Sequence, residues 1–134
     1  MADERDRGAV NQPRGVRCRP ITPADADAVA ALLHDGFPER SHAFWSACLR
    51  RLAVRELPDG LPRYGFLLEA DQRVVGVQLV IAAQVEASAP RCNVSSWYVL
   101  PAYRSLAPLL ARHVLRPAHA TFLNVSPAPH TRAT

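Results

Sequence analysis

The sequence contains no lysine, so all 16 of its basic side chains are arginines, set against 12 aspartates and glutamates. Coding bias toward arginine and alanine is the ordinary explanation of this composition. The resulting net charge of +4 suits an anionic ligand, although it is modest. No long basic run with interleaved aromatic residues occurs, which argues against a nucleic-acid-binding surface.

Cysteine is scarce as well. The three residues Cys18, Cys48 and Cys92 form no C-x-x-C pair, which argues against a zinc ribbon and favours reduced thiols in the cytoplasm. Long apolar runs are also missing, because the longest one, 74–83, is too short to span a bilayer. We therefore expect a cytoplasmic protein without a membrane-spanning segment.

The sequence lacks the short motifs of several enzyme classes, namely G-x-S-x-G, the P-loop and H-E-x-x-H. His119 and His130 flank the segment 120–125, which we predict to be the last strand. Neither has an acidic or cysteine partner nearby in the sequence, so we expect no metal site. The composition is that of an ordinary globular protein, with 49% hydrophobic and 21% charged residues. The length predicts one domain over 16–134, preceded by a flexible tail, 1–15, which has no apolar core of a secretion signal.

Hydrophobic periodicity predicts five strands and three helices in the order β-α-α-β-β-β-α-β. The strands are expected at 16–21, 64–70, 74–83, 91–99 and 120–125, and the helices near 22–36, 41–53 and 105–115. This order predicts an α/β (α+β) fold with a mixed, mainly antiparallel sheet flanked by helices. The run 74–83 is apolar on both faces, so it should be a central strand covered on both sides.

Capping residues mark the expected helix starts. Thr22 and Asp25 have the three-residue spacing of a capping box, and Ser41 can cap the second helix. Ser105 can cap the third helix, with Pro108 in the first turn, where no backbone hydrogen bond is lost.

The second helix has one apolar face and carries Arg50, Arg51 and Arg55 on the rest of its surface. These arginines could attract an anion. A solvated helix face is the ordinary interpretation, and it is the one that we predict.

The stretch Val99-Leu100-Pro101-Ala102-Tyr103-Arg104, together with the element order, resembles the GNAT superfamily of acyl-CoA N-acyltransferases. In that family a similar segment ends the fourth strand, and a loop of pattern Q/R-x-x-G-x-G/A then opens the third helix. Here the loop reads Arg104-Ser105-Leu106-Ala107-Pro108-Leu109, which keeps the arginine and replaces both glycines. The start Ile21-Thr22-Pro23-Ala24-Asp25 and the hairpin at 66–83 are similar to the family too.

The resemblance implies acetyl-CoA, or another acyl-CoA, as co-substrate. It implies that pantetheine lies in a splayed gap beside the fourth strand, where a backbone N–H polarises the acyl carbonyl. It also implies that the pyrophosphate meets the amides of the loop. The residues expected to bind the cofactor are Trp97, Tyr98, Val99, Arg104, Ser105, Leu106, Ala107, Pro108 and Leu109.

The loop itself fits a phosphate less well than the family pattern does. Amides at a helix N-terminus suit a pyrophosphate, and glycines let the backbone approach it closely. Ala107 is a small loss, whereas Leu109 adds bulk and Pro108 removes one donor. The segment is compatible with two interpretations. It is either a phosphate-binding loop of low affinity or an ordinary helix N-terminus that binds no ligand.

No catalytic residue can be assigned. Many relatives use a carboxylate on the fourth strand to deprotonate the acceptor amine, but the corresponding positions here are Asn93, Ser95 and Ser96. Glu69 and Glu86 are possible substitutes, with solvated surface carboxylates as the alternative. Relatives often use a tyrosine after the fifth strand as general acid, and the sequence ends before that helix.

The resemblance therefore predicts an N-acyltransferase that moves an acetyl or other short acyl group to a small-molecule or peptide amine. The replaced glycines and missing carboxylate favour an alternative, a catalytically weak or inactive GNAT-like binding or regulatory domain. A basic anion-binding module is the third reading. The family's last helix and strands are missing, so we expect a truncated domain whose last strand is an exposed edge, open to homodimer formation.

Overall fold

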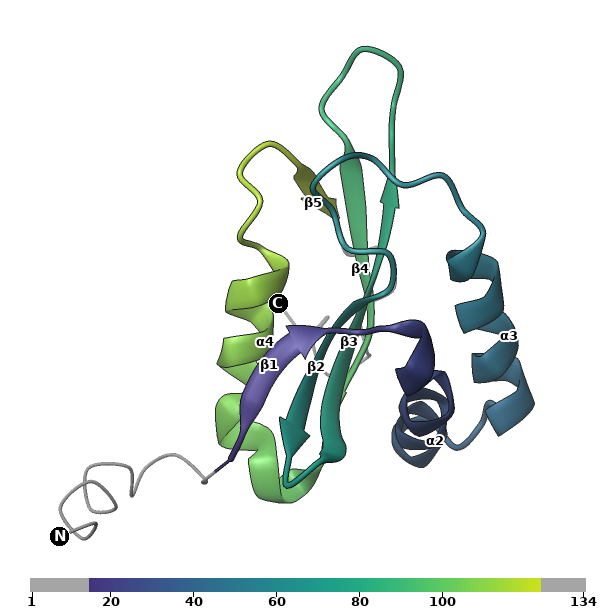
Figure 1. Cartoon of the computed structure of the whole chain (residues 1–134), viewed down its shortest axis with the longest axis vertical. Coiled ribbons are helices and arrows are strands. Elements are labelled where there is room, and N and C mark those ends of the chain that lie inside the picture. The colour runs from purple at the N-terminus through teal and green to yellow at the C-terminus, as the bar shows by residue number, and fades with distance from the viewer. Residues whose placement is uncertain (1–14, 124–134) are drawn as a thin grey trace, which may run out of the picture.

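The computed structural model describes residues 15–123 (Figure 1). The elements are β1 (Arg17–Pro20), a 3₁₀ helix η1 (Pro23–Asp25), α2 (Ala26–Gly36), α3 (His42–Ala53), β2 (Gly65–Ala70), β3 (Arg73–Ala83), β4 (Arg91–Val99), a 3₁₀ helix η2 (Pro101–Leu106), α4 (Ala107–Val114) and β5 (Thr121–Leu123). This order confirms the predicted one. The predicted tail up to residue 14, the end of the last predicted strand and the segment 126–134 lie outside the described residues.

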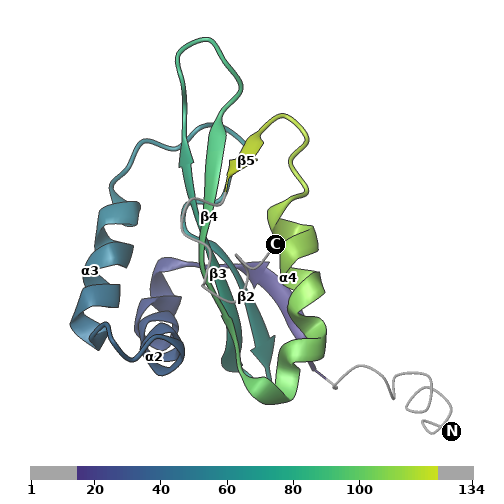
Figure 2. The same cartoon turned by 180° about the vertical axis from the view of Figure 1, so that it is seen from behind.

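The strands form one five-stranded sheet in the order β1-β2-β3-β4-β5. Pairing is antiparallel from β1 to β4, and β5 pairs with β4 in parallel. Figures 1 and 2 show α2 and α3 on one face of the sheet and α4 on the other. The mixed, mainly antiparallel sheet is therefore confirmed, as is the prediction that 74–83 and 91–99 are antiparallel neighbours.

Both faces of the sheet carry a hydrophobic core, and β3 contributes to each. On the α2 and α3 face, Val77 and Leu79 pack with Leu33. On the α4 face, Val75 packs with Leu110, and Val80 packs with Val114. The alternating sides of β3 are thus both buried, which confirms that it is a doubly covered central strand. Of the predicted stripe on α4, Leu106, Leu110 and Val114 are buried and Leu109 is half-buried.

A two-residue turn joins β2 to β3. Asp71 and Gln72 have φ angles of 51° and 65°, so both central residues are left-handed, as in the type I′ turns that suit the twist of a hairpin. At the other end of β2, Gly65 has a φ of 129°, a backbone conformation that side chains rarely adopt.

Two of the three predicted helix caps are present. The backbone N–H of Thr22 donates to the Asp25 carboxylate at 2.7 Å, and Ser41 Oγ accepts a hydrogen bond from the Phe44 N–H at 3.0 Å. The predicted Ser105 cap is wrong, because Ser105 lies within η2 and α4 begins at Ala107 without a side-chain cap. The 3₁₀ helix η2 runs directly into α4, and the Ala107 N–H at the start of α4 donates to the Arg104 carbonyl in η2.

The last described strand is short. Among the described residues, β5 forms an edge of the sheet, where Phe122 is half-buried and Leu123 is 38% exposed. Pairing of two chains through this edge stays a prediction, which the molecular mass in solution would test by light scattering.

Candidate functional site

A β-bulge interrupts β4 near its C-terminal end. Gln78 of β3 pairs with Trp97, whereas the next residue, Leu79, pairs with Ser95. Ser96 is therefore the extra residue, and its φ of 51° is left-handed. A bulge of this kind bends the strand and redirects its side chains, and it is frequent beside active sites.

On the side where β5 pairs, the described residues give β4 a strand partner only along its first third. β5 pairs with Arg91, Cys92 and Asn93, and the described residues provide no strand partner on that side for 94–99. The resemblance implies a splayed gap on this side of the fourth strand, and that gap stays a prediction. Backbone groups in this half of β4 are in a position to hydrogen-bond an extended ligand.

The structure places the three predicted β4 residues in different surroundings. Trp97 is 47% exposed, while Val99 is buried. The Tyr98 ring faces α2, where its centroid lies 6.3 Å from that of Phe37 and its ring also lies against Gly36. Trp97 is thus the large side chain of this group with free surface for a ligand.

The segment 104–109 differs from an open phosphate loop. Its first half is the end of η2, and the Ala107 N–H donates to the carbonyl of Arg104. Pro108 has no N–H, and Leu106 is buried. Fewer amides are therefore free for a phosphate than a glycine-rich loop would offer. The Arg104 side chain is exposed, and its Nε donates to the Val99 carbonyl at 3.3 Å, which ties it to the end of β4.

One buried polar atom lies unsatisfied close to the bulge. Gln78 Oε1 has no hydrogen-bond partner, and Gln78 is 6% exposed. Cross-strand pairing puts its side chain on the same face of the sheet as Trp97. A buried acceptor without a donor is costly, so this side chain destabilises the fold locally.

A cavity of about 670 Å³ lies on the opposite face of the sheet, between α3 and the strands β3 and β4. Its apolar wall includes Trp45, Leu79 and Ile81, and its β4 side is formed by Ser95 and Ser96. The two serine hydroxyls lie 3.1 Å apart. The bulge is therefore shared by the open edge of β4 and by this cavity.

Three arginines also line this cavity, namely Arg40, Arg51 and Arg55. The predicted solvated face agrees with the structure, because Arg50, Arg51 and Arg55 are all exposed. Arg51 and Arg55 also line the cavity, whereas Arg50 does not. A signal was available for Arg51, because Phe44, Cys48 and Arg51 recur at helical spacing within α3 and so share one face.

Neither proposed substitute for the missing carboxylate lies at the bulge. Glu69 is on β2, two strands away from β4, and it forms ion pairs with Arg19 at 2.7 Å and with Arg17 at 3.7 Å. Glu86 lies in the exposed loop that joins β3 to β4. Of the residues that the structure describes, no Asp or Glu lines the cavity beside Ser95 and Ser96.

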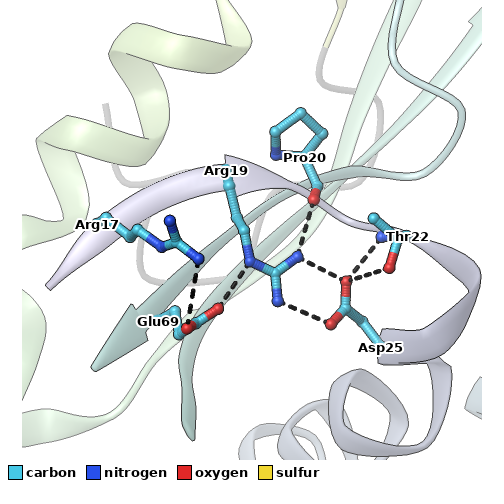
Figure 3. Close-up of polar contacts among 6 residues, drawn as sticks. All are labelled: Arg17, Arg19, Pro20, Thr22, Asp25 and Glu69. Carbon is cyan, nitrogen blue, oxygen red and sulfur yellow. Dashed lines mark hydrogen bonds and ion pairs between the residues drawn. The ribbon is translucent and has the colours of Figure 1, made fainter. Parts of the chain in front are cut away.

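Glu69 belongs instead to an ion cluster that ties β1 to β2 and η1 (Figure 3). Arg19 is its centre, since its Nη atoms donate to both Asp25 carboxylate oxygens at 2.8 Å while its Nε donates to Glu69. The hydrogen bonds from Arg19 hold the pKa of the Asp25 carboxyl well below its usual range. This cluster is structural, because every charged group in it is paired.

The thiols of Cys18 and Cys92 have little nucleophilic character. Burial raises the pKa of the Cys18 thiol to about 11, and it also raises the pKa of Cys92. Within residues 15–123, no group of three or more His, Cys, Asp or Glu side chains is placed to hold a metal ion. No helix of the described part is long and apolar enough to cross a membrane.

No protein-family model and no curated protein matches the sequence. Solved structures do match the fold. An aminoglycoside N-acetyltransferase, AAC(6′)-Iy in complex with CoA, has a TM-score of 0.65 and 19% identity, covering 90% of this chain and 83% of that one. Naa50 of Arabidopsis thaliana, in complex with the bisubstrate analogue CoA-Ac-MVNAL, has a TM-score of 0.61 and 18% identity, covering 81% and 70%.

An acetyltransferase of Trypanosoma brucei is similar as well, with a TM-score of 0.60 and 14% identity over 87% of this chain and 85% of that one. At these identities, the likeness establishes the fold. The chain has the GNAT fold of the acetyltransferases, as the segment around Tyr103 and Arg104 indicated.

Proposed function

We propose that the protein is an acyl-CoA-dependent N-acyltransferase, with acetyl-CoA as the acyl donor and an amine as the acceptor. The observation that carries the proposal is the meeting of two features at one point of the GNAT fold. The open edge of β4 and the cavity beside α3 both reach the Ser95–Ser96 bulge. A donor on one side and an acceptor on the other would then come together there.

In this proposal the donor lies along the open half of β4. Backbone groups of Trp97, Tyr98 and Val99 hold the pantetheine. The pyrophosphate lies against the segment 105–109, where Arg104 adds a charge-assisted contact. The residues of that segment are Ser105, Leu106, Ala107, Pro108 and Leu109.

The reaction needs little chemistry from the protein itself. The neutral amine attacks the thioester carbonyl, a C–N bond forms, the C–S bond breaks, and CoA leaves as the thiol while the amine loses its proton. Holding the two reactants together supplies much of the rate. Because no carboxylate lines the cavity, we propose that water accepts the proton, which favours turnover at alkaline pH, where more of the amine is neutral.

We expect Arg104→Ala to weaken acetyl-CoA binding by about 1–3 kcal/mol, or roughly 5- to 150-fold, the range for a hydrogen bond to a charged group. Isothermal titration of both proteins with acetyl-CoA measures this. Arg112→Ala is the matched control, since Arg112 is exposed on α4 and lies outside the segment. Equal affinities of the Arg104 variant and the wild type would remove Arg104 from the site.

A binding or regulatory domain is the second candidate. It is favoured by the η2 turns, which occupy the Ala107 amide, and by the loss of one donor at Pro108. The same titration separates the two. A protein that binds acetyl-CoA but releases no CoA thiol in the presence of a broad set of amines would be of this second kind.

A further inference from the structure

We propose that the acceptor is a small amine that carries an anionic group, a carboxylate or a phosphate, and that Arg40, Arg51 and Arg55 bind this group in the cavity. The inference deepens the proposed function. It rests on that function only in treating the bound molecule as the acceptor of the acyl group. The binding of an anionic small molecule at this place is testable without any acyl transfer.

The first argument is uncompensated charge. Arg40 lies just before α3, Arg51 is in its last turn and Arg55 follows it, and all three residues line one cavity. Among residues 15–123, no carboxylate lines that cavity and no ion pair involves these arginines, although Arg55 also lines a neighbouring pocket with Glu56 and Asp59. An anion is what would compensate them.

The contacts that these side chains do make are weak ones. The Arg40 guanidinium lies over the Phe44 ring at 4.7 Å. Arg51 donates to the Cys48 sulfur at 3.4 Å, and Arg55 donates to the Ala82 carbonyl at 3.4 Å. All three are exposed, and each retains guanidinium N–H groups for a planar oxyanion, which arginine recognises through two parallel hydrogen bonds.

The second argument is the shape and lining of the cavity. Its volume of about 670 Å³ lies within the range of small-molecule sites, roughly 300–1,000 Å³. Trp45, Leu79 and Ile81 offer an apolar surface for the body of the ligand. Within the described part of the chain, Trp45 Nε1 is a buried donor without a hydrogen-bond partner. A low-polarity wall strengthens the attraction between the arginines and an anion.

The same charges disfavour polycationic acceptors. Aminoglycosides carry several ammonium groups, and placing them among three arginines brings like charges together, which is a common means of rejecting a wrong ligand. We therefore infer that this chain differs in acceptor from the aminoglycoside N-acetyltransferase AAC(6′)-Iy, although the two share a fold with a TM-score of 0.65.

Two measurements test the inference. The first is binding without acetyl-CoA: N-acetylphenylalanine and phenyl phosphate are titrated into the protein, followed by tryptophan fluorescence and calorimetry, beside the neutral N-acetylphenylalaninamide. We expect at least one of the two anions to bind ten-fold or more tightly than the neutral amide, with an affinity that falls as salt is added. Comparing N-acetylphenylalanine with phenyl phosphate shows whether the site prefers a carboxylate or a phosphate.

The variant Arg51→Gln should weaken anion binding by ten-fold or more and leave the neutral amide unchanged, whereas Arg50→Gln, one residue along the same helix, should change neither. The inference is overturned if the anions bind no better than the amide, or if both variants behave alike. Circular dichroism of each variant confirms that it is folded, as expected for exposed side chains.

The second measurement is acetyl transfer from acetyl-CoA, followed by mass spectrometry. We expect phenylalanine to exceed phenylalaninamide, or phosphoethanolamine to exceed ethanolamine, by ten-fold or more in kcat/KM, with kanamycin the poorest acceptor. A folded protein that binds anions through Arg51 but transfers no acetyl group would contradict the proposed function and leave the anion site standing. Turnover with a preference for kanamycin would support the proposed function and overturn this inference.

Discussion

Gly65→Ala is expected to destabilise the protein by about 3–5 kcal/mol, enough to unfold a domain of ordinary stability at moderate temperature. Gly65 has a φ of 129°, and a Cβ atom there would collide with the Gln78 carbonyl oxygen and would lie 2.9 Å from Leu79 Cα and Val80 N. These are backbone atoms of β3, so no side chain can rotate away. The change must either separate β2 from β3 or refold the entry to β2.

Urea unfolding, followed by circular dichroism, measures this effect. Gly60→Ala is the matched control, because Gly60 also has a positive φ, 80°, but a Cβ atom there would meet only the His119 ring at 3.7 Å. Its cost should be about 1 kcal/mol, from the left-handed backbone alone. Equal losses in the two variants would show that the close approach of β2 to β3 is not what requires Gly65.

Arg19→Gln is expected to cost about 2–4 kcal/mol at neutral pH. The variant loses the Arg19 hydrogen bonds to both carboxylates, whose side chains are only 12% exposed for Asp25 and 16% for Glu69. Asp25 then keeps only its hydrogen bonds from Thr22, and Glu69 keeps only the longer contact with Arg17. Uncompensated charge of this kind is costly where solvent is limited. Arg17→Gln is the control, since Arg17 is 68% exposed and reaches Glu69 only at 3.7 Å, so its loss should stay within about 0.5 kcal/mol.

The Arg19 effect should depend on pH in a defined direction. Because Arg19 lowers the pKa of Asp25 in the folded state, the stabilisation is complete above the usual carboxyl pKa of 3.8 and is lost as the pH falls below it. The difference in unfolding free energy between wild type and Arg19→Gln should therefore narrow from pH 5 toward pH 2. A gap that stays constant over this range would mean that Arg19 acts by packing and not by charge.

The candidate site was only partly predictable from the sequence. The lead-in to Tyr103 and Arg104 indicated the fold, while the gap beside β4 that the resemblance implies stays a prediction. Ser105 was predicted as a helix cap because serine before an apolar stripe is a common start signal. The structure instead extends a 3₁₀ helix from Pro101 to Leu106, and local propensity does not distinguish these two ways of satisfying the first amides.

The arginines of α3 show a second limit. Helical spacing puts Arg51 on one face with Phe44 and Cys48, but spacing does not show what that face meets. That face becomes one wall of a cavity only because α3 lies over β3 and β4. Ser95 and Ser96 form the opposite wall at the β4 bulge. Bulges depend on pairing between strands, which one strand's sequence does not contain.

What the sequence by itself determined is the set of elements and their order. Alternation in β4, the apolar run of β3 and the helical stripe of α4 are local patterns, and each follows from burying one or both faces of a regular element. The tertiary structure alone decided that Glu69 is paired with Arg19 and is no candidate base, that Gln78 Oε1 is left without a donor, and that three arginines share a cavity without a carboxylate. The physical reason is that charge pairing, desolvation and cavity shape depend on distances between segments far apart in the chain.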